Sequence, residues 1–132
     1  MKKLIILTAI TFLSAVTTFA TDPEMVNIQI GEQKVTTTGK ITVNFIEVME
    51  DSRCPANVNC IWAGNARVKI SLKRGRSSAK TFELNSTLDP RVIVFDCYEI
   101  SFGGLTPRPG EEAERGAASV STLTISIAEH KK

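Results

Sequence analysis

Histidine, tryptophan and tyrosine are scarce in this 132-residue chain, which has one of each. The single histidine, His130, lies among the last three residues, where chains are usually frayed. Catalytic triads and cysteine–histidine dyads therefore lack a positioned base. Carboxylates, Cys97, Tyr98 or a bound metal would have to carry any acid–base or nucleophilic step. The sequence favours a protein that is not an enzyme, and it disfavours a hydrolase or a redox enzyme.

An excess of charge is also missing once the N-terminal segment is set aside. Residues 1–20 begin with Lys2 and Lys3, continue with an apolar run and end in Thr18-Phe19-Ala20, which is typical of a secretory signal peptide. The chain has 16 basic and 14 acidic residues, and residues 1–20 hold two of the lysines and no acid, so residues 21–132 carry 14 of each. A neutral domain has no electrostatic footprint for phosphate backbones, so nucleic acid is not an expected partner.

Long hydrophobic runs are missing outside the leader. The apolar part of the leader is short for a membrane span, and no cysteine follows it to accept a lipid. We therefore expect a bacterial protein that is secreted or periplasmic, with no membrane insertion after signal removal. Disulfide bonds persist in both compartments. Residues 21–132 have the length of a single domain.

Alternation of apolar and polar residues predicts strands along most of residues 21–132. In residues 66–72 every second side chain is apolar, and residues 80–84 return after a turn, which predicts an antiparallel hairpin. The alternation in residues 41–48 changes phase near Phe45 and Ile46, which predicts a β-bulge or a strand buried on both faces. No helical period is present. About seven short strands predict an immunoglobulin-like antiparallel β-sandwich, with a partly open β-barrel as the alternative.

The cysteines predict one local disulfide bond. Cys54 and Cys60 are separated by five residues that include Pro55 and two asparagines, which favour a turn, so we expect these two cysteines to be bonded. A zinc site would need four ligands, and a C-x-x-C redox pair has a shorter spacing. Cys97 is then expected to be a small apolar side chain in or near the core, with intermolecular pairing as the alternative.

Three residues are predicted to belong to the structural core. If Cys60 begins a strand, Trp62 lies on the same face and packs beside the disulfide. Gly64 is small enough for a neighbouring backbone to approach. Tyr98 alternates with Glu99 at the start of another predicted strand, which places the phenol ring on the core side.

Two groups of polar residues are candidate sites. Glu47, Glu50 and Asp51 could offer oxygen ligands to calcium, but the spacing of a known calcium loop is missing, so they are a weak candidate beside a solvated rim or a group held by Arg53. No cofactor is expected. Residues 106–119 form a long connection with hardly an apolar residue, and such loops on a rigid sandwich often bind partners. The candidate binding residues in this connection are Thr106, Pro107, Arg108, Pro109, Glu111 and Glu112.

The run D-S-R-C-P-x-x-V-x-C-x-W-A-G at residues 51–64 resembles a motif of small, uncharacterised secreted bacterial β-domain proteins. Tyr98, followed by Leu105 and then Pro107-Arg108-Pro109, is similar to a second feature of these proteins. The resemblance implies a secreted β-domain and brings no activity with it.

The sequence therefore predicts an exported non-enzymatic binding or inhibitory module of the bacterial envelope. The expected partner is another protein or an envelope component. An accessory domain that stabilises the envelope by pairing through a sheet edge is the second possibility.

Overall fold

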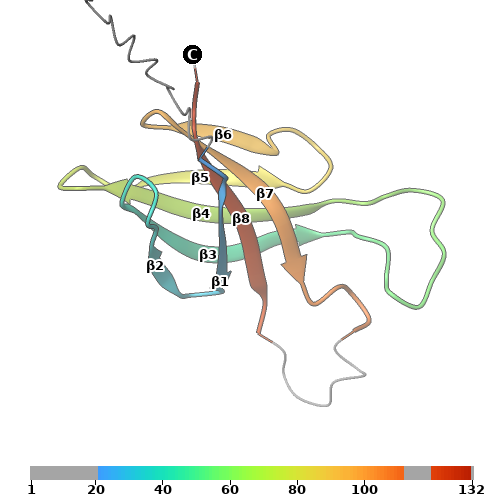
Figure 1. The fold of residues 1–132 in the computed structure, drawn as a ribbon. Helices are drawn as coiled ribbons and strands as arrows, with labels where there is room; N and C mark the ends of the chain where they lie inside the picture. Colours follow the sequence, from blue (N-terminus) through green and yellow to red (C-terminus); the bar gives the residue numbers. More distant parts are fainter. Residues whose placement is uncertain (1–20, 112–119, 132) are drawn as a thin grey trace, which may run out of the picture.

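The computed structural model describes residues 21–111 and 120–131, which form two antiparallel four-stranded sheets packed as a sandwich (Figure 1). One sheet has the strand order β1-β8-β7-β6, and the other has the order β2-β3-β4-β5. The predicted β-sandwich is confirmed, with eight strands instead of about seven, and the described residues do not close into a barrel. Within the same residues no helix is long and apolar enough to cross a membrane. The strands are β1 (Glu24–Gln29), β2 (Gln33–Val35), β3 (Ile41–Asp51), β4 (Ala66–Arg74), β5 (Lys80–Asn85), β6 (Val92–Phe95), β7 (Tyr98–Thr106) and β8 (Thr122–Glu129).

The core lies between the sheets and is built from alternating residues of the paired strands. On β4 the buried positions run from Ala66 to Leu72, as the alternation in the sequence predicted. On β8 the buried positions run from Leu123 to Ile127. Each fully buried leucine or isoleucine stabilises the fold by about 1.5–3 kcal/mol. The fully buried large side chains are Phe45, Ile28, Ile41, Ile70, Leu72, Leu84, Ile100, Leu123, Ile125, Ile127, Val43 and Val68.

The phase change in β3 is a β-bulge. The pairing of β3 with β4 shifts between Phe45 and Glu47, so that Phe45 is fully buried while Ile46 is 39% exposed. An extra residue in one strand turns the following side chains to the other face. The bulge predicted from the sequence is confirmed, and the alternative of a strand buried on both faces is not what the structure shows.

The hairpin between β6 and β7 has a two-residue turn, because Phe95 pairs directly with Tyr98. Its two turn residues, Asp96 and Cys97, have φ angles of 47° and 67°, and positive φ at both positions is the requirement of a type I′ turn. Cys97 is exposed at this tip. The expectation that Cys97 lies in or near the core is therefore wrong, because a two-residue turn points both of its central side chains away from the sheet.

Arg74 joins the two sheets at the end of the sandwich where this turn lies. Its Nη1 atom is 2.6 Å from Oδ2 of Asp96, and its Nε atom donates to the carbonyl of Gly39 at 2.8 Å. The guanidinium carbon lies 5.1 Å from the centre of the Tyr98 ring, a cation–π distance. The hydrogen bond to Asp96 raises the pKa of Arg74 above its ordinary value. Tyr98 is partly buried against the core, as predicted.

The C-terminal end of β8 is better ordered than the sequence indicated. The backbone N–H of His130 donates to the carbonyl of Cys97 at 2.9 Å. Its ring Nδ1 atom lies 3.1 Å from Oε2 of Glu99. The expectation of a frayed histidine with nothing to orient it is therefore wrong.

Candidate functional site

The candidate site is the disulfide loop, residues 52–65, which connects β3 to β4 at the other end of the sandwich. Cys54 and Cys60 are bonded as predicted, with 5.8 Å between their Cα atoms. Closing this short loop stabilises the fold by about 2.4 kcal/mol in the chain-entropy model. The disulfide also limits the shapes that the tip of the loop can adopt.

The two ends of the loop are hydrogen-bonded to each other. Ser52 donates its backbone N–H to the carbonyl of Asn65 at 2.8 Å, and the N–H of Asn65 donates to Oγ of Ser52 at 3.0 Å. Between them, Gly64 has a φ angle of +63°, and a Cβ atom there would lie 1.9 Å from the carbonyl oxygen of Ser52. The predicted close approach of a backbone to Gly64 is confirmed, since no larger residue fits without moving the loop.

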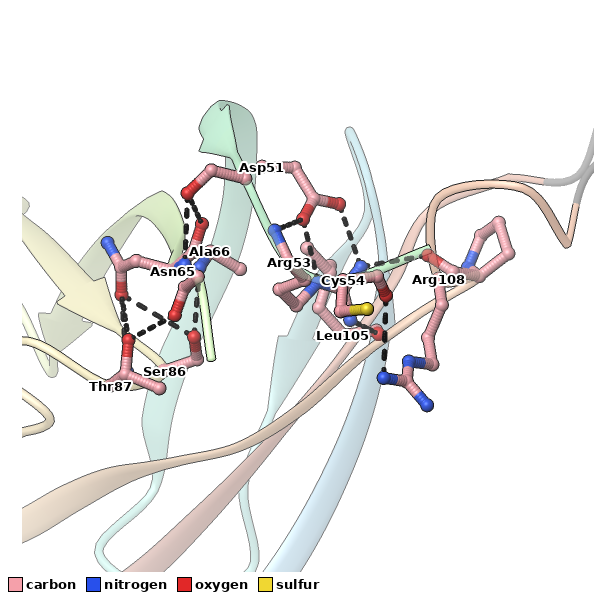
Figure 2. Close-up of polar contacts among 12 residues, drawn as sticks. Asp51, Arg53, Cys54, Asn65, Ala66, Ser86, Thr87, Leu105 and Arg108 are labelled. Carbon is pink, nitrogen blue, oxygen red and sulfur yellow. Dashed lines mark hydrogen bonds and ion pairs between the residues drawn. The ribbon is translucent and has the colours of Figure 1, made fainter. Parts of the chain in front are cut away.

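A buried amide network fixes the base of the loop to the segment after β5 (Figure 2). Asn65, only 4% exposed, donates from Nδ2 to Oδ1 of Asn85 at 2.8 Å. Its own Oδ1 accepts the N–H of Thr87 at 3.2 Å, and the hydroxyl of Thr87 donates to the carbonyl of Gly64 at 2.6 Å. Buried polar groups that are fully paired rigidify the structure around them. This network could not be predicted from the sequence, where its only signal is an asparagine at each boundary of the predicted hairpin.

Arg53 connects the loop to the opposite sheet. Its Nε and Nη2 atoms each lie 2.7 Å from one carboxylate oxygen of Asp51, which is a bidentate ion pair. The same guanidinium donates to the carbonyls of Leu105 and Pro107, at the end of β7. The Arg53 side chain is only 13% exposed. A charge-assisted fork of this kind is strong and directional, so it holds the loop at a defined angle to β7.

The segment after β7 lies against the disulfide loop. The N–H of Ala56 donates to the carbonyl of Pro109 at 3.0 Å, and Nη2 of Arg108 lies 3.4 Å from the carbonyl oxygen of Cys54. The N–H of Arg108 also donates to the carboxylate of Glu111 at 2.8 Å, which closes a turn. The structure therefore brings the described part of the predicted binding connection next to the disulfide loop.

The residues of this connection have different exposures. Thr106 is the last residue of β7, and Pro107 is buried, so Pro107 belongs to the framework. Arg108 is exposed, while Pro109 and Glu111 are half-buried. The predicted binding residue Glu112 and residues 113–119 lie outside the described residues.

Trp62 projects from the loop into solvent. It is 65% exposed, its neighbour Ile61 is 96% exposed, and Val58 is 56% exposed. The prediction of a buried Trp62 beside the disulfide is therefore wrong. It assumed that Cys60 begins a strand, but β4 begins only at Ala66, so the period-2 argument does not apply to Trp62.

The acidic residues before the loop are paired with basic ones. Glu47 lies 2.6 Å from Nζ of Lys69, Glu50 lies 3.8 Å from Nε of Arg67, and Asp51 binds Arg53. No three histidine, cysteine or acidic residues in the described ranges converge to hold a metal ion. The weak calcium site is therefore not supported, because each carboxylate already has a cationic partner.

A hollow of about 410 Å³ lies at the base of the loop and is lined by Glu50, Ser52, Ala63, Gly64, Asn65, Thr87 and Leu88. Leu88 is 59% exposed beside it. This end of the molecule therefore offers exposed apolar side chains on a fixed backbone.

Comparison of the chain with protein-family models, with curated proteins and with solved structures finds no match.

Proposed function

We propose that this protein is an exported, non-enzymatic binding or inhibitory module of the bacterial envelope. Its contact surface is the apolar tip of the disulfide loop, formed by Val58, Ile61 and Trp62. The observation that carries the proposal is the exposure of Ile61 and Trp62 on a loop that is closed by a disulfide and bound at its base. Tryptophan is enriched among the residues that dominate protein–protein binding energy.

The fixed backbone of the loop supports this function. A loop that is rigid before binding loses little conformational entropy when a partner orders it, so more of the contact energy becomes affinity. Arg53 and Asn65 supply this rigidity, because each joins the loop to a different part of the sandwich. A stiff loop with a projecting apolar tip is suited to insertion into a partner's groove, which is also how an inhibitor would block one.

The segment next to the loop extends the same surface. Arg108 is exposed beside Cys54 and adds a positive charge at the rim, where charged residues steer encounter more than they add affinity. The expected partner is another protein or an envelope component. The disulfide is compatible with the oxidising conditions of the periplasm or the extracellular medium.

The experiment is affinity capture from a native envelope fraction with immobilised protein of residues 21–132. Three forms are compared: the wild type, Ile61→Ala/Trp62→Ala, and Val35→Ala as a matched control. Val35 is 63% exposed, close to the value for Trp62, but lies on β2. We expect the double variant to lose the captured component and the control to retain it. Equal capture by all three forms would contradict the proposed surface.

A panel of peptide, ester and glycan substrates tests the non-enzymatic part of the proposal. We expect no turnover, with or without added calcium or zinc. Turnover that follows the protein through purification and disappears in a Cys97→Ser or Glu99→Gln variant would contradict it.

A further inference from the structure

β6 is a short outer strand that contains no lysine, proline or bulge. It is the last strand of its sheet, paired with β7 on one side and with no strand of the described residues on the other. Its four residues, Val92 to Phe95, are all apolar, and Val92 and Val94 are 44% and 53% exposed. Edge strands usually carry a lysine, a proline or a bulge that prevents further pairing. β1, at the other end of the sheet, has such a device, because Lys34 binds the carbonyl of Asn27.

The free backbone groups of β6 can be assigned from the pairing with β7. The N–H of Phe102 donates to the carbonyl of Arg91, and the tight turn makes Phe95 and Tyr98 another hydrogen-bonded pair. Hydrogen-bonded and non-bonded pairs alternate along an antiparallel ladder. Val92 and Val94 therefore direct their N–H and C=O groups away from β7, which is the pattern that accepts an added strand.

A hollow lies beside this edge, between the margins of the two sheets. It has a volume of about 450 Å³ and is lined by Arg74, Ser77, Ser78, Lys80, Phe82, Val94, Phe95 and Asp96. The rings of Phe82 and Phe95 meet edge to face, with 5.9 Å between their centroids. Figure 1 shows β6 running next to β5 of the other sheet at this side. In a strand added to β6, the residue opposite Val94 would point outward, as Val94 does. The residues on either side of it would then point inward, toward this hollow.

Ion pairs near the edge leave two cations, Lys80 and Arg91, and one acid, Asp89, without a partner among the described residues. Of the charged residues that line the hollow, Asp96 is bound by Arg74, and Lys80 has no ion-pair partner among the described residues. Arg91 precedes β6 and is likewise unpaired within the described ranges. A second copy of the chain added antiparallel to β6 would bring its own Arg91 toward Lys80. An acidic partner would instead be attracted to both cations.

We propose that β6 is a docking strand for an extended acidic segment of another protein, which adds to the sheet as a fifth strand and places an apolar side chain in the hollow beside Phe82. Backbone hydrogen bonds to Val92 and Val94 provide the affinity, and the hollow with Lys80 provides the specificity, as in other cases of strand addition. The surface is separate from the disulfide loop, so either proposal can fail without the other.

Fluorescence anisotropy with three labelled peptides of about eight residues tests this proposal. The first alternates valine and glutamate, the second alternates valine and lysine, and the third is the first peptide with every second backbone nitrogen methylated. We expect the first to bind at least about tenfold more tightly than the other two. Equal binding of the three peptides, or no binding of the first, would overturn the proposal.

Val94→Pro removes the outward N–H of β6 while leaving the bonds to β7 in place, because proline is tolerated where the N–H of an edge strand faces solvent. Val94→Thr is the matched control, since it keeps that N–H. We expect about a tenfold loss of affinity for the first peptide in the proline variant alone.

Amide hydrogen exchange of the wild type gives a second readout that does not depend on any variant. The amides of Val92 and Val94 should become protected when the first peptide binds, and the protection of Ile93, already bonded to β7, should stay the same. Unchanged exchange at both valines would overturn the proposal. So would a concentration-dependent dimer, seen by sedimentation, that Val94→Pro abolishes, because the occupant would then be a second copy.

Discussion

The Nη2 atom of Arg53 donates a hydrogen bond to the carbonyl oxygen of Pro107 at 2.9 Å, across 54 positions of sequence. The same side chain holds both carboxylate oxygens of Asp51. One guanidinium therefore ties the disulfide loop to the end of β7 in the opposite sheet. The loop and the segment that follows β7 form one surface because of this contact.

Replacement of Arg53 tests the importance of that connection for stability. Arg53→Ala removes the cationic partner of Asp51 and the side-chain donor to two backbone carbonyls, so we expect the free energy of unfolding to fall by about 2–4 kcal/mol. Arg53→Lys keeps the charge but cannot form the bidentate fork, and it should lose about half as much. Urea unfolding measures all three proteins. A change within about 0.5 kcal/mol for Arg53→Ala would show that the contact contributes little.

Alanine substitutions at two glycines with nearly the same backbone conformation distinguish the cost of steric crowding from the cost of backbone strain. Gly64 and Gly75 have φ angles of +63° and +59°, but a Cβ atom at Gly64 would lie 1.9 Å from the carbonyl of Ser52, whereas nothing lies within 4 Å at Gly75. We expect Gly75→Ala to cost about 1 kcal/mol and Gly64→Ala to cost about 3 kcal/mol or more, since the base of the loop must move. Thermal and urea unfolding would contradict this account if the two variants were equally stable.

Strands such as β4 and β8 could be predicted from the sequence because each has one buried and one exposed face. In β4 the alternation from Ala66 to Leu72 matches the burial observed, and the phase change at Phe45 correctly predicts the bulge. The disulfide could also be predicted, because Cys54 and Cys60 are close in sequence. These features depend on short-range patterns that a single sequence displays.

The parts of the site that could not be predicted depend on contacts distant in sequence or on the exact ends of strands. Arg53 binds backbone carbonyls of Leu105 and Pro107, and a carbonyl acceptor leaves no trace in the side-chain pattern. The alternation argument places Trp62 in the core because it starts the following strand at Cys60, whereas β4 begins at Ala66. The apolar residues on both sides of Cys97 show no boundary between β6 and β7, so the sequence does not reveal that Cys97 lies in a turn.

The carboxylate of Glu24 should make stability depend on pH. Its two oxygens accept the N–H groups of Thr37 and Thr38 at 2.9 and 2.6 Å. Burial raises the pKa of Glu24, but the hydrogen bonds from Thr38 and Thr37 lower it by more, so the pKa lies below its ordinary value of 4.5. The folded state therefore favours the charged form. This contribution to stability is fully present above the ordinary pKa, and it is lost as the pH falls through the lowered pKa.

Glu24→Gln provides the comparison for this pH dependence. We expect the wild type to melt at a higher temperature than the variant at about pH 7, and the difference to shrink as the pH falls from the ordinary pKa of 4.5 through the lowered pKa of Glu24. Thr37 and Thr38 keep their backbone amides in both proteins. A difference in melting temperature that is constant across this range would show that the charge of Glu24 is not what these amides recognise.

Cys97 occupies a backbone conformation that suits glycine better. Its φ angle is 67°, and it is exposed at the second position of the type I′ turn after Asp96, where Asp-Gly is a favoured pair. We expect Cys97→Gly to raise the free energy of unfolding by about 0.5–1 kcal/mol. This net gain is smaller than the relief of strain, because glycine also increases the conformational entropy of the unfolded chain. Cys97→Val should lower it, because β-branched side chains are strained at positive φ. Destabilisation by glycine would contradict the turn assignment.

Trp62 provides the clearest distinction between a core residue and a contact residue. A tryptophan buried beside the disulfide would make Trp62→Ala cost about 3–5 kcal/mol, as large core truncations do. With 65% of the side chain exposed, we instead expect the free energy of unfolding to stay within about 0.5 kcal/mol of the wild-type value. Leu84→Ala, which truncates a fully buried side chain, serves as the positive control and should cost about 2–5 kcal/mol. Urea unfolding of the three proteins, with the tryptophan-free variant followed by circular dichroism, measures both effects. A loss for Trp62→Ala as large as that for Leu84→Ala would place the indole in the core and remove the apolar tip from the proposed contact surface.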